Sequence, residues 1–358
     1  MSETNSENKI ALTQFSHGGG CGCKIAPAVL QQILATKSPL PSYDKLLVGN
    51  TSNDDAAVFD LDGEHCLIST ADFFTAIVDD PFLFGKIAAA NAISDVYAMG
   101  GTPNLAIAIL GFPVEQLSVE IAQQIVEGAR ETCFDAQIPL AGGHSIDNKE
   151  PIFGLSVNGI VKKENLKKNN TAQAGDLLFL TKPIGVGILS SAQKQKKLRD
   201  EDYKPWVAQL TKLNNIGSAL GEISGVSAMT DITGFGLLGH LHEMCTGSRL
   251  SANLFYDRIP IIEAAKIYAA EKVIPNATYR NWNAYNSSVS FESGVNVMEA
   301  FNLLPDPQTN GGLLLAVHPD HIFPVQKILK EFGYEKFTTP IGKMMPQSEK
   351  VIYISQNE

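Results

Sequence analysis

Residues 65–112 read HCLISTADFFTAIVDDPFLFGKIAAANAISDVYAMGGTPNLAIAILGF, and this stretch decides the fold class. The apolar run at 65–72 predicts a strand, and the alanine-rich segment 84–100 predicts a helix because its apolar residues have helical spacing. Residues 104–112 predict a further strand. An amphipathic helix at 114–136 and strands at 138–147 and 151–161 continue the alternation. The sequence therefore predicts an α/β (mixed α+β) fold.

The chain has 358 residues, more than the roughly 250–300 that one hydrophobic core usually serves, so two domains are expected. A second α/β block begins with LLFLTKPIGVGIL at residue 177 and ends near VIYIS at 351–355. We expect four parts: a mobile, glycine-rich N-terminal arm and the segment after it at 1–45, a first domain at 46–161, a polar and exposed linker at 162–176, and a second domain at 177–358.

The composition is that of a folded globular protein, with 44% hydrophobic and 18% charged residues. A formal net charge of -10 argues against nucleic acid or an anionic membrane as the main partner. The N-terminal residues do not combine a basic start with an apolar core, and the apolar runs fall short of the ~20 residues of a membrane helix, which predicts a cytoplasmic protein. Five cysteines fit reduced thiols, and Cys66, Cys133 and Cys245 are expected to be buried and inert.

Several aspartates occupy positions in or beside apolar strands and helices, where a charged side chain is unusual. Asp54 and Asp55 are adjacent at the start of an apolar strand, where their charges repel and require water or a cation. Asp72 ends the run CLISTAD, and Asp231 ends VSAMTD. Each of these is often only a turn former or helix cap. Asp95 is different, because a carboxylate in the middle of an apolar helix must be paired or metal-bound if it is buried. Mg²⁺, which takes oxygen ligands together with substrate phosphates, fits this set.

Two glycine-rich stretches, AGGHS at 141–145 and TGFGLLGH at 233–240, could turn backbone N–H groups toward a phosphate. Neither is a Walker A loop or a dinucleotide fingerprint. Tight packing between a strand and a helix would also explain each of them.

The stretch HGGGCGCK at 17–24 places two cysteines beside three glycines and a lysine. His17 with Cys21 and Cys23 gives at most three zinc ligands, and a disulfide between these cysteines would close a strained ring. Lys24 and His17 would lower the pKa of a nearby thiol, which favours a reactive thiolate. Incidental cysteines on a mobile tail remain the alternative.

Eight motifs together resemble selenophosphate synthetase, over nearly the whole chain and in the same order: HGGGCGCK, VGNTSNDDAAV, ISTADFF, NAISDVYAMGG, LAGGHSID, PIFGLSVNGIV, AMTDITGFGLLGH and DPQTNGG. This family is related to aminoimidazole ribonucleotide synthetase. The resemblance implies two α/β domains of that fold, a homodimer formed through the first domain, and ATP bound in a cleft. Two departures are Asn310, where the family usually has serine, and PNATYRN at 275–281, which replaces a glycine-richer stretch.

The resemblance also implies roles for individual residues. Cys21 matches the position that handles selenium, Cys23 looks dispensable, and Lys24 matches a catalytic lysine that also contacts the nucleotide. The implied metal ligands are Asp55, Asp95 and Asp231, and the other implied nucleotide contacts are Ser52, Asn53, Asp54, Asp72, Asp95 and, from the partner subunit, Gly143, His144 and Ser145.

The implied reaction consumes ATP, selenide and water and yields selenophosphate, AMP and orthophosphate, which would supply selenium for selenocysteine and selenouridine synthesis. Mg²⁺ is the implied cofactor, because bridging metal ions neutralise the charge that develops on the phosphates. A related enzyme acting on a ribonucleotide would not need HGGGCGCK, and a non-enzymatic selenium or metal carrier would not need the aspartates. We expect the arm to close over bound ATP.

Overall fold

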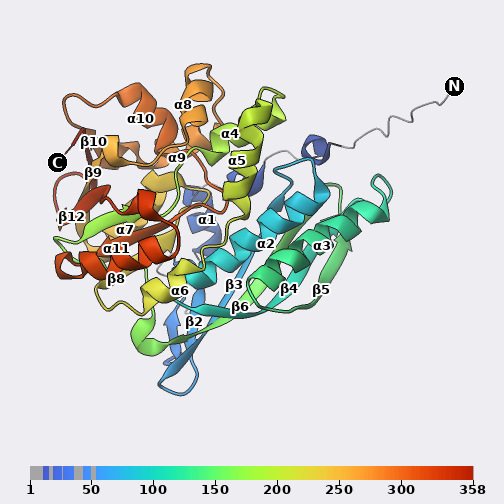
Figure 1. Cartoon of the computed structure of the whole chain (residues 1–358), viewed down its shortest axis with the longest axis horizontal. Helices are drawn as coiled ribbons and strands as arrows, with labels where there is room; N and C mark the ends of the chain where they lie inside the picture. The colour runs from blue at the N-terminus through green and yellow to red at the C-terminus, as the bar shows by residue number, and fades with distance from the viewer. Residues whose placement is uncertain (1–10, 16–18, 26, 36–42, 50–53, 358) are drawn as a thin grey trace.

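The computed structural model describes residues 11–15, 19–25, 27–35, 43–49 and 54–357. Two β-sheets, each packed against helices, lie next to each other (Figure 1). The N-terminal part described here contains two 3₁₀ turns and a short helix: η1 (Leu12–Phe15), η2 (Gly20–Cys23) and α1 (Pro27–Leu34). Mobility of the arm stays a prediction, and residues 16–18, including His17, lie outside the described residues.

The first sheet has six strands in the order β1-β2-β3-β6-β4-β5. Neighbouring strands are antiparallel except β4 and β5, which are parallel. Helices α2 and α3 pack together in front of this sheet (Figure 1). The elements are β1 (Leu46–Val48), β2 (Ala57–Asp60), β3 (His65–Thr75), α2 (Pro81–Ala98), β4 (Thr102–Phe112), α3 (Val119–Asp135), β5 (Leu140–Asp147) and β6 (Ile152–Lys162).

The second sheet has seven strands in the order β10-β13-β9-β12-β7-β11-β8. Its strands are β7 (Leu177–Leu180), β8 (Val226–Asp231), β9 (Leu250–Phe255), β10 (Val289–Phe291), β11 (Leu313–Val317), β12 (Gly342–Pro346) and β13 (Ile352–Ser355). Its helices are α4 (Val186–Lys194), α5 (Asp200–Thr211), α6 (Ile216–Gly221), α7 (Gly236–Ser248), α8 (Glu263–Ala270), α9 (Asn276–Tyr285), α10 (Val297–Leu303) and α11 (Ile322–Glu331). Further 3₁₀ turns are η3 (Lys163–Asn165), η4 (Tyr256–Arg258), η5 (Asn286–Ser288), η6 (Pro319–His321) and η7 (Glu335–Phe337).

Strand β11 shows why the second sheet needs helices on both faces. All five of its residues are buried. Leu314 and Ala316 belong to the larger core cluster, whereas Leu313, Leu315 and Val317 belong to a second cluster that includes residues of α6 and α11. This alternation follows from the two-residue period of a strand, and it explains the uninterrupted apolar run in the sequence.

Helix α2 joins the two halves of the molecule. Its residues from Phe84 onward are buried except Lys86, as expected for a helix that is apolar on all sides. Ala98, at its end, packs into the cluster that contains α6 and α11. Helix α6 comes so close to α2 that a Cβ atom on Gly217 would collide with the carbonyl oxygen of Tyr97. A polar side chain on α2 is therefore held in the contact zone of both sheets.

The predicted mixed α/β fold is confirmed, but several local expectations were wrong. Strand β3 continues past Asp72 because it pairs with β6 along its whole length, from His65 opposite Lys162 to Thr75 opposite Ile152. Asp72 therefore lies within a strand, not at its end. Helix α3 begins at Val119, five residues later than the pattern indicated.

The segment predicted to be an exposed linker also contains buried side chains. Lys167 and Asn169 are 5% and 2% exposed. Lys167 Nζ donates to the carbonyl oxygen of Ile223, 3.0 Å away, so this part of the segment packs against the second half of the molecule. Cys66, Cys133 and Cys245 are buried, as expected. No described helix is both long and apolar enough to cross a membrane.

Candidate active site between the two sheets

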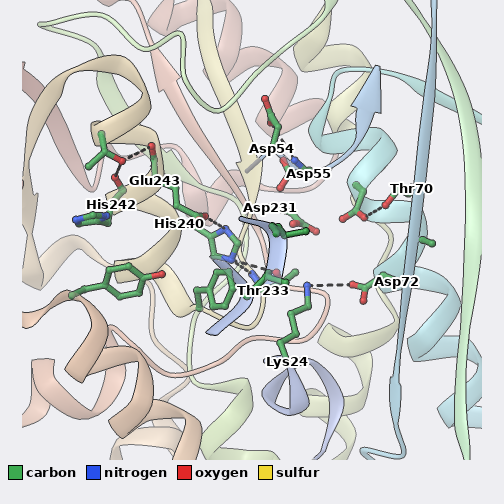
Figure 2. A pocket seen from close by; sticks show the side chains of 17 residues that line it. Lys24, Asp54, Asp55, Thr70, Asp72, Asp231, Thr233, His240, His242 and Glu243 are labelled. Carbon is green, nitrogen blue, oxygen red and sulfur yellow. Dashed lines mark hydrogen bonds and ion pairs between the residues drawn. The ribbon is translucent and has the colours of Figure 1, made fainter. Parts of the chain in front are cut away.

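A cavity of about 390 Å³ lies between the two halves of the molecule, and we call it the aspartate cavity (Figure 2). The side chains come from both sheets, from α1, α2, α7 and α9, and from the segments after η2, before β2 and before α7. Five aspartates line it: Asp54, Asp55, Asp72, Asp95 and Asp231. Lys24 is the one lysine or arginine among the described lining residues. The structure thus brings together the aspartates that the sequence singled out.

Hydroxyl groups, not cations, hold the most buried carboxylates. Thr70 Oγ1 donates to Asp95 Oδ2, and Ser94 Oγ donates to Asp231 Oδ2, each at 2.5 Å. Thr230 Oγ1 donates to Asp55 Oδ1 at 2.8 Å. Neutral donors fix the orientation of a carboxylate without cancelling its charge, so the negative field of the cavity remains.

Burial and mutual repulsion make ionisation of this cluster costly. Burial, followed by the charge of Asp231, raises the pKa of Asp55 and of Asp95 well above the usual range. Burial raises the pKa of Asp231 to about 6, although the hydrogen bond from Ser94 opposes it. Burial raises the pKa of Asp54 to about 6 as well. A cation that enters the cavity removes this cost.

Lys24 reaches into the cavity from the segment after η2. Its Nζ lies 3.6 Å from Asp72 Oδ2, as Figure 2 shows. Burial lowers the pKa of Lys24, but the charges of Asp72, Cys21, Asp95 and Asp231 outweigh it and raise the pKa above the usual lysine value. Lys24 is therefore a permanent positive charge among the carboxylates.

The donor set fits Mg²⁺ but does not form a finished ion cage. All the candidate ligands are oxygens, and Asp55 Oδ2 is buried without a hydrogen-bond partner among the described residues. In the described part of the chain, however, no three His, Cys, Asp or Glu side chains are placed to hold one metal ion. Mg²⁺ commonly takes one or two carboxylates and completes its shell with water and substrate phosphates. The cavity fits ions that arrive with a polyphosphate.

Cys21 is buried next to the cavity without lining it. Its backbone N–H donates to Thr309 Oγ1 at 3.0 Å, and its Sγ donates to Asn91 Oδ1 at 3.3 Å. The Nδ2 atom of Asn91 donates to Asp72 Oδ2 at 2.6 Å. Asn91 therefore links the thiol of Cys21 to the carboxylate that contacts Lys24. Asn91 stands four residues before Asp95 on α2, so both side chains project from one face of this apolar helix.

Asn310, which stands where the family that the sequence resembles usually has serine, stabilises a turn of the second half of the molecule. Its φ angle of 47° lies in the left-handed region, which asparagine tolerates better than most residues. Its Nδ2 donates to the carbonyl oxygens of Leu210 and Lys212 at 2.7 and 2.9 Å. Its backbone N–H donates to Asn91 Oδ1 at 2.6 Å, so this turn supports the same asparagine that holds Cys21.

The stretch 233–240, singled out in the sequence as a possible phosphate cradle, contributes Thr233, Phe235 and His240 to one wall of the cavity, whereas the part of that wall formed by His242, Glu243 and Tyr285 was not foreseen. His240 Nε2 accepts a hydrogen bond from the backbone N–H of Thr233 at 3.1 Å, and burial lowers the pKa of His240 to about 3, so the ring is neutral. Burial raises the pKa of Glu243 to about 8. The rings of His242 and Tyr285 lie with centroids 5.0 Å apart. These side chains form the less charged end of the cavity (Figure 2).

Not every predicted nucleotide contact reaches this cavity. Ser52 and Asn53 lie outside the described residues. Gly143, His144 and Ser145 lie on the exposed edge strand β5 and do not line the cavity of their own chain. Sequence reasoning assigned these three residues to the partner subunit's site, and that assignment stays a prediction.

We predict that Asp55→Asn stabilises the metal-free protein at pH 8 and has little effect near pH 4. A carboxyl group whose pKa is higher in the folded than in the unfolded chain costs folding free energy once pH exceeds the unfolded pKa of ~4. At pH 8 the variant should therefore unfold at a clearly higher urea concentration than the unmodified protein, because it lacks a charge that burial and the neighbouring carboxylates disfavour in the folded state. Urea unfolding in the presence of a chelator measures it.

The control for this experiment is Asp44→Asn at an exposed position, which should change stability little at either pH. A destabilised Asp55→Asn protein at pH 8 would contradict the repulsion that we infer from the geometry.

Two family models match the chain. Residues 53–161 match "AIR synthase related protein, N-terminal domain", and residues 173–355 match "AIR synthase related protein, C-terminal domain". The solved structure of thiamine-monophosphate kinase from Stenotrophomonas maltophilia K279a has a TM-score of 0.63 at 18% identity and covers 88% of this chain and 92% of its own. Hydrogenase maturation protein HypE in complex with ATP has a TM-score of 0.62 at 16% identity and covers 96% of this chain and 94% of its own. Both share the fold.

Curated relatives are much more similar in sequence. Selenide, water dikinase of Shewanella sp. (strain MR-4) is 56% identical over 316 residues, which cover 88% of this chain and 89% of the relative. Selenide, water dikinase of Shewanella baltica (strain OS155 / ATCC BAA-1091) is 56% identical over 308 residues, which cover 86% of each chain. With two AIR synthase related domains and this degree of identity over most of its length, the chain belongs to the selenide, water dikinase family.

Proposed function

We propose that this chain transfers a phosphoryl group from ATP to selenide and hydrolyses the remaining diphosphate, with selenophosphate, AMP and orthophosphate as products. The observation that carries this proposal is the presence of Lys24 among five aspartates in one cavity, with Cys21 on the adjoining turn. A site for a neutral or cationic small molecule would not need bridging cations, whereas a polyphosphate brings them. The product would serve reactions that need activated selenium, such as selenocysteine and selenouridine synthesis.

We assign the metal-holding role to Asp55, Asp95 and Asp231, with Asp54 beside them, because they line the cavity and Lys24 is the one lysine or arginine among its described lining residues, too little positive charge to balance them. Bound Mg²⁺ would neutralise the charge that develops on the phosphates. Lys24 adds a positive charge that Asp72 holds in place, so it can contact the transferred phosphoryl group.

The α7 end of the cavity suits the nucleoside part of ATP. Phe235, His242 and Tyr285 offer ring faces, and the neutral ring of His240 adds a polar surface without charge. Aromatic faces stack with planar bases. Asp54, next to the positions of Ser52 and Asn53, would lie near the phosphates. We keep the domain limits 46–161 and 177–358 as part of this proposal, together with a cytoplasmic location.

We further propose a homodimer formed by the sheet face that α2 and α3 leave uncovered. In the register of the strands, Phe73 on β3, Ile107 on β4 and Ile146 on β5 lie on the same face, and all three are exposed, at 48%, 42% and 55%. An exposed apolar face of this kind marks an interaction surface. A partner on this face would also cover Gly143, His144 and Ser145, which would then lie within reach of its nucleotide.

The first test is AMP and orthophosphate release from ATP with and without selenide. We predict selenide-dependent release by the unmodified protein. The rate of release should fall about 100-fold or more in Lys24→Gln and in Asp95→Asn, because each removes a charge from the transition-state environment.

The cysteine variants test the role of the thiol. Cys21→Ser should lose the selenide-dependent reaction, and Cys23→Ser should retain most of it. Lys327→Gln, an exposed change on α11, is the control. Full selenide dependence in Cys21→Ser would contradict the role of that thiol.

The second test is the oligomeric state. We predict that the unmodified protein sediments as a dimer and that Ile107→Glu sediments as a monomer, because it places a charge in the apolar face. The variant should also bind ATP more weakly, since the proposed contacts from the partner are lost. Phe323→Glu, on α11 outside this face and 76% exposed, serves as the control and should remain dimeric. A dimeric Ile107→Glu protein would exclude this surface as the interface.

A further inference from the structure

A second cavity of about 500 Å³ adjoins the turn that carries Cys21, and we call it the Arg280 cavity. Gly19 and Gly22 of this turn line it, together with residues of α4 and α9. None of its described lining residues also lines the aspartate cavity. Lys24, a few residues along the same segment, lines the aspartate cavity instead. The segment from Gly19 to Lys24 therefore contacts two different cavities.

The two cavities differ in charge. Lys194 and Arg280 line the Arg280 cavity beside the hydroxyl groups of Ser190, Ser191 and Thr309, and no carboxylate is among its described lining residues. The aspartate cavity has five aspartates and Glu243 against one lysine. A small anion is therefore attracted to the Arg280 cavity and repelled by the aspartate cavity when no metal ion is bound.

Arg280 stands between this cavity and Cys21. Cys21, Lys24 and Arg280, with Gly22, Ile25, Gly234, Phe235 and Asn281, enclose a void of about 10 Å³, which has room for about one water molecule. Gly22 and Arg280 line both this void and the Arg280 cavity. Arg280 Nη2 donates to the carbonyl oxygen of Gly22 at 2.8 Å. This hydrogen bond joins the two residues that line both spaces, and Cys21, which lines the void, is only 1% exposed.

Selenide can reach the buried Cys21 only if this turn opens slightly, and the turn is rich in glycine. Gly20 has a φ angle of +53°, and a Cβ atom there would collide with Thr309 Oγ1 and crowd Ile77. Besides the packing, the hydrogen bonds that hold the turn include those from Cys21 N–H to Thr309, from Cys21 Sγ to Asn91 and from Arg280 to Gly22. Glycine-rich segments absorb the backbone change that such an opening needs.

We propose that the Arg280 cavity is the access site for selenide, which is the hydrogen selenide anion at neutral pH, and that Arg280 attracts this anion and directs it toward Cys21. This inference rests on the proposed function. ATP with its cations would occupy the aspartate cavity, so selenide reaches Cys21 without passing the nucleotide or crossing the field of the aspartates. Arg280 acts here as a positioning residue, because it contacts the turn and not the reacting phosphate.

Steady-state kinetics with sodium hydrogen selenide under anaerobic conditions tests the proposal. The variants are Arg280→Gln, which removes the charge, Arg280→Lys, which keeps it, and Lys194→Gln, which removes the second positive charge of the cavity lining, on α4. We expect KM for selenide to rise about tenfold in Arg280→Gln and several-fold in Lys194→Gln, with KM for ATP unchanged, because a focused field raises local anion concentration by about tenfold or more. Arg280→Lys should keep a KM for selenide near that of the unmodified protein. Lys327→Gln controls for net charge.

A purely structural role of Arg280 gives a different result. Displacement of the turn would move Lys24 with Cys21, so Arg280→Gln would change kcat and KM for ATP together, and Lys194→Gln would have no effect. That pattern, or an unchanged KM for selenide in both charge-removing variants, would overturn the access site. If the unmodified protein releases no AMP in response to selenide, the proposed function itself fails. If it releases AMP but the variants keep its KM for selenide, only the access site fails.

Discussion

Repulsion among buried carboxylates is the constraint on which the active site depends. Asp95 is fixed by α2, which is buried between the two sheets, and Asp231 ends a strand of the second sheet, so neither can move away from the other without loss of core packing. Their hydrogen-bond partners are hydroxyl groups, which leave the charge in place. Without cations the repulsion among the carboxylates destabilises the folded protein, and cations that enter with a polyphosphate remove this repulsion. Relief of this repulsion on binding therefore adds to the free energy of substrate binding.

The turn that carries Cys21 and Lys24 connects this charged site to the rest of the molecule. Lys24 forms an ion pair with Asp72, and Asn91 joins Asp72 to the thiol of Cys21 by hydrogen bonds, so the groups that we assign to phosphate and to selenium belong to one polar network. Asn310, in a left-handed conformation, supports Asn91 from the second domain. The two substrates would then approach one network from two cavities of different charge, and neither has to displace the other.

Much of this arrangement could be predicted from the sequence, but only where a residue conflicted with its local pattern. Asp95 in an apolar helix was such a conflict, and the structure places it in the cavity. Asp72 looked like a strand end, whereas pairing with β6 extends β3 beyond it, and long-range pairing leaves no local signal. The stretch 233–240 was noticed for its glycines, but the side chain of His240 and Glu243 beyond it were not singled out, because their spacing is ordinary for a helix. Their unusual pKa values come from burial against residues far away in the chain.

The most direct test of the central claim is calorimetric titration of ATP into the protein with and without Mg²⁺. If the carboxylates hold the polyphosphate only through cations, ATP binds in the presence of Mg²⁺ and fails to bind detectably in a chelator, and Asp55→Asn lessens this difference because it removes part of the repulsion. An ATP affinity that is the same with and without Mg²⁺ would contradict the claim, since the nucleotide would then be held by the protein without bridging cations.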